Sequence, residues 1–337
     1  MNASSASTTS TTSATTSSLP SVSLVIPVYN GKKTIRFCLD SIMQLDYPKD
    51  RLEVIVVDNN SKDETPEIVK QYPVKLVFER EKQGPHQATN TGLREAGGEI
   101  IAFTDSDCYV SPDWLRKLVA PFANPDVVAT GGKIDAYTPD SQVEKYLQRR
   151  FASQNGLRIA DDFPASLLTA NAAYRAEAVR VAGCFNENLY TGAEVDLAWR
   201  VQWQTGKQVV YVPDAVIYHK FSPGLKRLFR HYHIYGYSEI ILGTLYKHLP
   251  SYPSKPGQQV RFMLTQQVPS LFIYILSLLI RPVRGLLSKR GRAYADYVAW
   301  PMMCLMAESG SLYGKLQGLW HTRFYTRPFW QSEHRVI

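Results

Sequence analysis

Two carboxylates separated by a single residue, Asp105 and Asp107, are the side chains of this sequence best suited to chemistry. They follow the apolar run 99–104, which predicts a buried strand. In an extended chain, residues two apart point to the same face, so both carboxylates leave the strand end side by side. Such a pair suits a hard divalent cation, Mn²⁺ or Mg²⁺, that is shared with substrate phosphates. Because an Asp-x-Asp triplet is also frequent in turns, its meaning depends on the surrounding elements.

Strands and helices alternate around this pair and predict an α/β fold. Apolar runs at 23–30, 52–57 and 74–78 predict further strands, and the intervening segments predict helices over about 33–44, from about 63, and over 86–96. This alternation favours a parallel sheet covered by helices. In such sheets ligands bind at the carboxyl ends of the strands. Asn30, Asp58, Gly84 and Asp105 all fall at those ends, which predicts a site there.

Five segments, in order and at the expected spacing, resemble the family 2 glycosyltransferases, which are inverting enzymes of the GT-A fold that use nucleotide sugars. They are VIPVYN at 25–30, VVDNNSKDET at 56–65, NTGL at 90–93, FTDSD at 103–107 and TGAEVDLAWR at 191–200. The resemblance extends over roughly residues 22–220. It implies a GT-A (Rossmann-like), mostly parallel sheet with helices on both faces. It also implies a metal-dependent hexosyltransferase, with a UDP-sugar as the favoured donor.

The resemblance further implies which residues would hold the donor and the metal. The implied nucleotide-sugar contacts are Pro27, Tyr29, Asn30, Asp58, Asn90 and Asp105. Asp58 would accept a hydrogen bond from a pyrimidine N–H or from ribose, and Asp105 would contact ribose or a metal-bound water. Asp107 would bind the metal with Asp105, and His219 matches a metal-ligand histidine of related enzymes. For His219, an ordinary core or surface histidine is the alternative interpretation.

Glu194 is the predicted general base, which would remove the acceptor proton as the hydroxyl attacks the anomeric carbon. Direct displacement of this kind inverts the anomeric centre. Asp196 is the competing candidate, and it could instead be only an N-terminal charge on a helix expected over 197–204. The sequence departs from the family pattern at Ala193, where a carboxylate is usual, and at Thr89, where a basic residue is common.

The segment after the predicted base lacks the Gln-x-x-Arg-Trp element of processive polysaccharide synthases. Arg227-Leu228-Phe229-Arg230 occupies the comparable region without a tryptophan. We therefore expect transfer of a single sugar and not chain extension.

Basic charge is concentrated in the C-terminal third. Residues 1–219 contain 22 Lys and Arg against 26 Asp and Glu, whereas residues 220–337 contain 16 against 4. Arg261 and Arg281 bracket the uncharged stretch 262–280, and a shorter apolar stretch covers 297–307. Apolar segments among basic charges favour a membrane surface over nucleic acid. The basic loop between the stretches disfavours a span, so we expect interfacial or re-entrant helices.

These observations predict three regions: a Ser/Thr-rich disordered tail at 1–19, a GT-A domain at 20–225 and a basic helical, membrane-associated region at 226–337. The expected location is the cytoplasmic face of a membrane, with a lipid-linked or cell-envelope glycan precursor as acceptor. The alternative is a soluble cytoplasmic enzyme with a helical cap. Two other functions stay open: a nucleotidyltransferase, although the first loop lacks its Gly-rich basic character, and a non-catalytic sugar-nucleotide-binding membrane adaptor.

Overall fold

A computed structural model of the chain describes residues 19–152, 157–160, 163–189, 191–221, 223–249, 252, 255–286 and 292–324. Residues 1–18 of the predicted tail, and Lys289 and Arg290 of the predicted basic loop, lie outside these ranges. A central sheet of eight strands has the order β3-β2-β1-β4-β9-β6-β10-β5. Its strands are β1 (Val22–Val28), β2 (Leu52–Asp58), β3 (Lys75–Phe78), β4 (Ile100–Thr104), β5 (Cys108–Val110), β6 (Val127–Ala136), β9 (Asn171–Arg175) and β10 (Gln208–His219).

The first four strands of the sheet are parallel, as the sequence predicts, but the second half is mixed. β1 pairs in parallel with β2 and β4, and β2 with β3, whereas β9 runs antiparallel to both β4 and β6. β5, which follows directly after Asp107, turns back and pairs antiparallel with β10, so that Cys108 lies opposite His219. This return brings two sequence-distant parts of the predicted site to one sheet edge.

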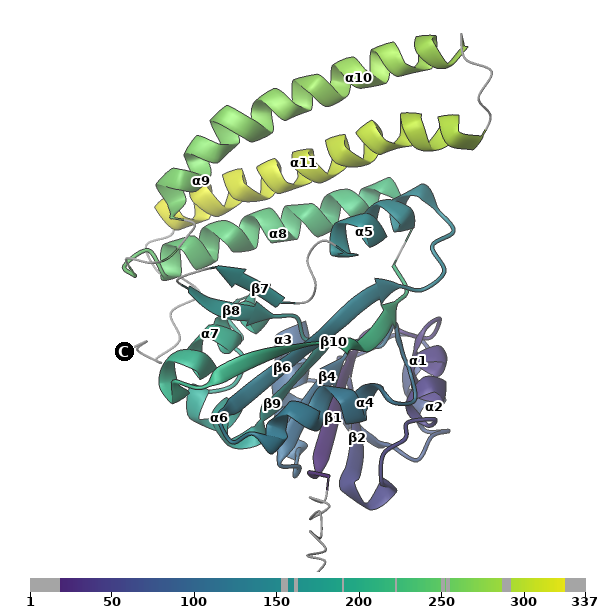
Figure 1. Cartoon of the computed structure of the whole chain (residues 1–337), viewed down its shortest axis with the longest axis vertical. Coiled ribbons are helices and arrows are strands. Elements are labelled where there is room, and N and C mark those ends of the chain that lie inside the picture. The colour runs from purple at the N-terminus through teal and green to yellow at the C-terminus, as the bar shows by residue number, and fades with distance from the viewer. Residues whose placement is uncertain are drawn as a thin grey trace, which may run out of the picture.

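Helices cover both faces of the sheet, which confirms the predicted α/β layering (Figure 1). Strand residues alternate between the two faces because successive side chains of a strand point in opposite directions. One face packs α3 (Pro85–Glu95), α6 (Ala176–Ala182) and α7 (Ala193–Thr205) on Val25, Ile55 and Phe103. The other packs α1 (Ile35–Ile42) and α4 (Trp114–Val119) on Leu24, Ile26 and Val56. A short α2 (Thr65–Val69) and a two-stranded sheet of β7 (Leu157–Ala160) and β8 (Phe163–Leu167) complete the domain with α5 (Gln142–Ala152).

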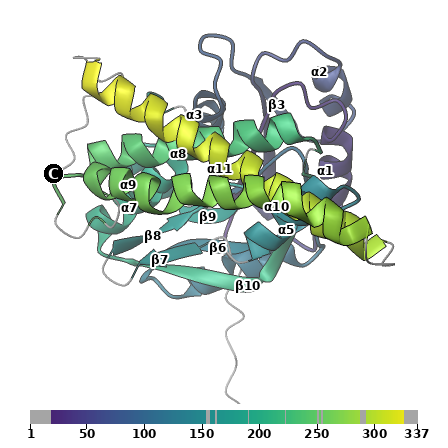
Figure 2. The same ribbon diagram turned by 90° about the horizontal axis from the view of Figure 1, so that it is seen from above.

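The C-terminal region forms a stack of long helices above the sheet (Figures 1 and 2). α8 (Leu225–Leu245) lies next to the domain, α11 (Arg292–Phe324) packs along α8, and α10 (Val268–Leu286) packs along α11. α9 (Pro256–Phe262) and the π-helical turn η3 (Met263–Gln267) lead directly into α10. The apolar stretch 297–307 is thus not a separate segment, because it lies within α11, where Met303, Cys304 and Ala307 are buried.

Glycines let α8 and α11 approach closely. A Cβ atom added at Gly314 of α11 would lie 1.9 Å from the carbonyl oxygen of His233 on α8, and one added at Gly236 of α8 would lie 2.1 Å from that of Ser311. Three glycines of α11 that are spaced four apart all face α8, namely Gly310, Gly314 and Gly318. Small residues at this spacing allow close backbone contact between helices. The His233 Nε2 and Gln317 Oε1 atoms, 2.6 Å apart, add a polar contact between the same two helices.

We expect Gly314→Ala to lower the free energy of unfolding by about 1–3 kcal/mol, because the added methyl group must push a backbone carbonyl away. Gly257→Ala in α9 is the matched control, since nothing lies within 4 Å of its added Cβ and alanine favours helix. Thermal unfolding of both variants, in one detergent, measures the difference. Equal stability of the two variants would contradict the close α8–α11 contact.

Candidate active site

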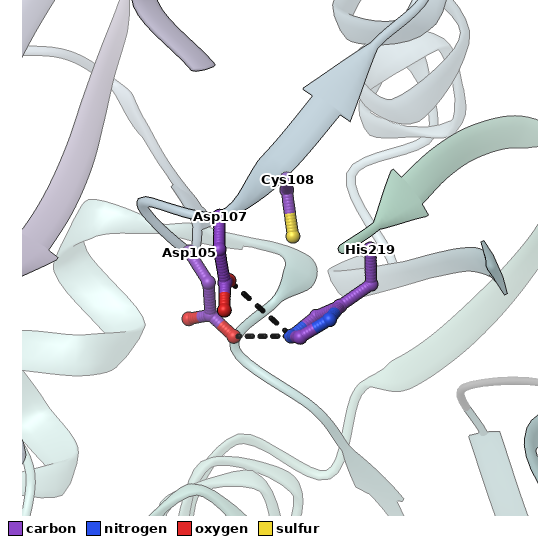
Figure 3. Close-up of side chains that lie close together, drawn as sticks. All are labelled: Asp105, Asp107, Cys108 and His219. Carbon is purple, nitrogen blue, oxygen red and sulfur yellow. Dashed lines mark ion pairs between the residues drawn. The ribbon is translucent and has the colours of Figure 1, made fainter. Parts of the chain in front are cut away.

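The two carboxylates predicted from the sequence lie beside His219 at the end of β4 (Figure 3). The turn that carries them is closed by a hydrogen bond from Cys108 N to Asp105 O at 3.1 Å, and β5 then pairs with β10. His219 Nε2 lies 3.3 Å from Asp107 Oδ1 and 3.9 Å from Asp105 Oδ2. A ligand atom from each of these three residues and from Cys108 lies within 4.8 Å of the others. The structure therefore brings the predicted metal residues together.

The donor set of this cluster fits a hard divalent cation. Two carboxylates and an imidazole are ligands that Mn²⁺ accepts. Burial, and then the neighbouring charge of Asp107, raise the pKa of the Asp105 carboxyl above its ordinary value. A bound cation would relieve this repulsion between the two carboxylates. Burial also raises the pKa of the Cys108 thiol, and a soft sulfur ligand suits Mn²⁺ or Mg²⁺ less well than carboxylate or imidazole does.

Glu194 lies on the first turn of α7 and lines one cavity together with Asp105, Asp107 and His219. It belongs to the helix because α7 begins earlier than the sequence predicts. The helix starts at Ala193 and not at 197, and Gly192 precedes it with a φ of 81°. That φ favours glycine, and a Cβ there would also lie 2.3 Å from Ser238 Oγ. Ala193 is fully buried in the core, so the position that lacks the usual carboxylate faces the interior of the domain.

Burial raises the pKa of Glu194, and the charge of Asp105 raises it further. A base acts in its deprotonated form, and a raised pKa makes it a stronger base near neutral pH. We therefore expect kcat to fall as the pH drops through this raised pKa, which lies above the ordinary value of about 4.3 for glutamate. A pH profile of kcat at saturating donor measures this acid limb. A rate that stays constant to the pH at which the protein unfolds would exclude Glu194 as the base.

Asp196, the competing candidate base, does not line the cavity. It is buried, and it accepts hydrogen bonds from Tyr246 Oη at 2.5 Å and from Arg200 Nε at 2.9 Å. Arg200 also donates to the carbonyl oxygens of Ala182 and Cys184. The carboxylate therefore ties α7 to the end of α8 and to the loop after α6. Its role in this structure is to hold the helix that carries Glu194.

The residues predicted to hold the nucleoside gather at the ends of β1 and β2. Asn30, with a φ of 50°, accepts a hydrogen bond from Lys62 N at 2.8 Å, and Asp58 Oδ2 accepts one from Ser61 N at 3.0 Å. Asp58 Oδ1 is buried and has no hydrogen-bond partner among the described residues. An unpaired buried acceptor is costly, so this oxygen is open to a donor group of a ligand.

Of the other predicted nucleotide-sugar contacts, Pro27 and Tyr29 lie close to Asn30 at the end of β1, whereas Asn90 lies on another element. Pro27 is partly buried at the end of β1, and the Tyr29 side chain is 50% exposed. Asn90 lies within α3, where its amide exchanges hydrogen bonds with Phe185 N and O at 3.0 and 2.9 Å and donates to Glu187 Oε1 at 3.0 Å. In this structure Asn90 holds the loop before α7.

A cavity of about 300 Å³ joins the metal residues to Glu194. Asp105, Asp107, Glu194 and His219 contribute to its lining. Its remaining walls come from α5, α8, β6, Phe221 and the turn before β9, through Leu147, Arg227, Leu228, His231, Tyr235, Ile134, Phe221, Leu168, Thr169 and Ala170. Sequence reasoning missed the α8 residues, although their spacing of four places Arg227, His231 and Tyr235 on one helix face.

Comparisons with known proteins agree with this geometry. Residues 23–182 match the model of the family "Glycosyl transferase family 2". The chain is 32% identical over 223 residues to Glycosyltransferase AglE of Haloferax volcanii, an alignment that covers 63% of this chain and 72% of that protein. It is 29% identical over 213 residues to the pre-mycofactocin glycosyltransferase of Mycobacterium tuberculosis, covering 61% of this chain but only 44% of that one.

Among solved structures, the chain resembles the mannosyltransferase PcManGT from Pyrobaculum calidifontis in complex with GDP-Man and Mn²⁺. The TM-score is 0.58 at 24% sequence identity, over 91% of this chain and 89% of that one. The similarity extends through most of both chains and shows that they share the GT-A fold.

Proposed function

Since this chain belongs to glycosyltransferase family 2, we propose that it transfers one sugar from a nucleoside-diphosphate sugar to an acceptor hydroxyl with inversion. The observation that carries this proposal is the convergence on one cavity of a carboxylate pair, a histidine and a partly buried glutamate. Family membership makes the chain a glycosyltransferase and favours this reaction over nucleotidyl transfer.

Asp107, Asp105 and His219 would hold a divalent cation, Mn²⁺ or Mg²⁺, at the end of β4. Such an ion supplies charge neutralisation for the diphosphate of the donor and of the departing group. The three side chains come from two segments that the β5–β10 pairing fixes, so their positions are set before a ligand arrives. A preorganised site of this kind loses little free energy in reorganisation.

Glu194 would accept the proton of the acceptor hydroxyl. It lies in the cavity with the metal residues, and the buried ion pair of Asp196 and Arg200 holds its helix in place. A carboxylate on one side of the sugar and the diphosphate on the other favour direct displacement, which inverts the anomeric carbon.

A uridine nucleotide is the proposed donor, as the family resemblance favours, and the open Asp58 Oδ1 can accept a hydrogen bond from the N3–H of uracil. Thymine and guanine also carry a ring N–H, so a screen of donors has to decide among the three nucleotides. A screen of UDP-, GDP- and dTDP-sugars with Mn²⁺, scored by the nucleoside diphosphate released, tests both the reaction and this preference. Release from none of the donors would contradict the proposed transfer. Release from GDP-sugars alone would show that the donor nucleotide carries guanine and not uracil.

The outer face of the helical stack supports a membrane-bound acceptor. The run 256–281 is long and apolar enough to cross a membrane by length and composition. Exposed large apolar side chains line it, namely Phe262, Leu264, Phe272, Ile273, Ile275, Leu276, Leu279 and Ile280. They lie on α9, η3 and α10, and α10 forms the layer farthest from the sheet (Figure 1). An unpartnered apolar face of this size suits insertion into lipid.

The packing of the stack favours an interfacial position over a span. α10 packs along α11, which packs extensively on α8 and so on the catalytic domain. A membrane-crossing α10 would have to leave these contacts or carry the domain with it. We propose that α10 lies in the plane of the cytoplasmic membrane surface, with the basic charge of the C-terminal third drawn to anionic lipids. The acceptor would then be a lipid-linked or cell-envelope glycan precursor.

We expect the full-length protein to sediment with liposomes that contain anionic lipid. High salt should weaken this binding without abolishing it, because salt screens the basic charges but not the apolar insertion. Leu276→Glu and Leu279→Glu together should release the protein, whereas Lys117→Glu in α4 of the catalytic domain should not. A protein that is monomeric without detergent and ignores such liposomes would contradict the membrane assignment.

A further inference from the structure

We propose that Arg227, on the first turn of α8, binds a phosphate group of a substrate inside the active-site cavity. The inference deepens the proposed function, on which it rests, by giving the cavity an anion-binding residue. The phosphate could belong to the diphosphate of the donor or to a phosphorylated acceptor. Both sources present the same chemistry to a guanidinium, which binds phosphate through two parallel hydrogen bonds.

A substrate phosphate adds negative charge to a cavity that is already acidic, so its binding favours a cationic side chain there. Asp105, Asp107 and Glu194 contribute three carboxylates to the lining, and a divalent ion at the first two would offset only part of the combined charge of carboxylates and phosphate. Among the described lining residues, Arg227 is the only Lys or Arg. Burial lowers the pKa of His231, one turn further along α8, to about 4, so that this imidazole is neutral at pH 7.

Arg227 is exposed and makes no ion pair with a carboxylate of the described residues. The first turn of α8 contains no acidic residue, and Lys226 adds a second positive charge there. Positive charge in a first turn is unfavourable because it faces the positive end of the helix dipole. A bound anion would interact favourably with the positive end of the helix dipole and with the Arg227 side chain.

The position of Arg227 places the phosphate on the side of the cavity that α8 forms. Its neighbours in the lining, Leu147, Leu228 and Phe221, belong to the apolar cluster that α5, α8 and α11 share. The nucleoside residues at the ends of β1 and β2 do not contribute to this lining. A substrate phosphate at Arg227 would therefore lie between the metal residues and the helical stack.

Binding measurements on the full-length protein in detergent test this assignment without relying on turnover. UDP and GDP are titrated with Mn²⁺, and methyl phosphate is then titrated into protein saturated with Mn²⁺ and UDP. Arg227→Gln removes the charge, Arg227→Lys keeps the charge but not the paired hydrogen bonds, and Lys226→Gln is the matched control outside the cavity. Removing a charge-assisted hydrogen bond should weaken binding by about 10- to 100-fold.

Each outcome decides the assignment. Weaker nucleotide binding in Arg227→Gln, with Arg227→Lys between it and the wild type, would assign the donor diphosphate. Unchanged nucleotide binding with loss of methyl phosphate would assign the acceptor. If neither ligand is affected more than in Lys226→Gln, Arg227 is not an anion site. If the wild-type protein binds no nucleotide, the proposed function is contradicted. In that case methyl phosphate is titrated into protein that holds Mn²⁺ but no UDP, and the Arg227 variants still test the anion site.

Discussion

Glu194→Gln should leave the donor bound and lower kcat by about 10²- to 10⁴-fold, the usual contribution of a general base. Glutamine keeps the shape of the side chain in the cavity but cannot accept the acceptor proton. The variant should also lose the acid limb of the pH profile. Single-turnover measurement of released nucleoside diphosphate, at saturating donor and acceptor, gives the rate, and titration of UDP with Mn²⁺ gives the binding.

Asp196→Asn is the informative counterpart, because its carboxylate lies in a buried ion pair and not in the cavity. Removing one partner of a buried pair leaves Arg200 uncompensated, which should lower the free energy of unfolding by about 3–5 kcal/mol. Glu194→Gln should not destabilise the protein in the same urea titration. If instead Asp196→Asn lost more kcat than Glu194→Gln in well-folded protein, the role of base would pass to Asp196.

Asp107→Ala should lose the divalent-dependent part of nucleotide binding while the fold persists. Its Oδ1 is the carboxylate oxygen nearest to His219, so its removal takes away a central ligand of the proposed metal site. Loss of even an outer partner of a metal ligand costs about 10- to 100-fold in affinity, and loss of the ligand itself should cost about 100-fold or more. Titration of Mn²⁺ in the presence of UDP measures the effect.

An exposed aspartate provides the control for that titration. Asp113 precedes α4 and pairs only with Lys117 and Ser111 among its described neighbours, so Asp113→Ala should leave Mn²⁺ affinity unchanged. Mn²⁺-dependent activity that survives Asp107→Ala in folded protein would remove this residue from the metal site.

Local patterns predicted the first half of the sheet well, because consecutive strands and helices there are neighbours in space. The runs at 52–57, 74–78 and 99–104 correspond to β2, β3 and β4, and the predicted helix 86–96 corresponds to α3. The antiparallel β9 and the return of β5 against β10 were not predicted, because pairing between strands that lie far apart in the sequence leaves no local signal.

At the site, the metal residues were predicted from the sequence, but the start of α7 and the contribution of α8 were not. Asp105, Asp107 and His219 were predicted to share a metal, and the structure places them together through the β5–β10 pairing. The α7 start was placed four residues late, because Gly192 begins the helix with a left-handed conformation that the polar pattern did not indicate. Which α8 face meets the cavity depends on how that helix packs, and local pattern does not determine packing.

The location of Mn²⁺ and UDP in one crystal tests the central claim most directly. Anomalous scattering at the manganese edge should give a single strong peak in contact with Asp107 and His219. The uracil ring of UDP should lie toward Asp58. Glu194 should lie across the sugar position from the β-phosphate of UDP. A manganese ion bound elsewhere, with the nucleotide away from Asp105 and Asp107, would contradict the assignment of this cavity as the site of sugar transfer.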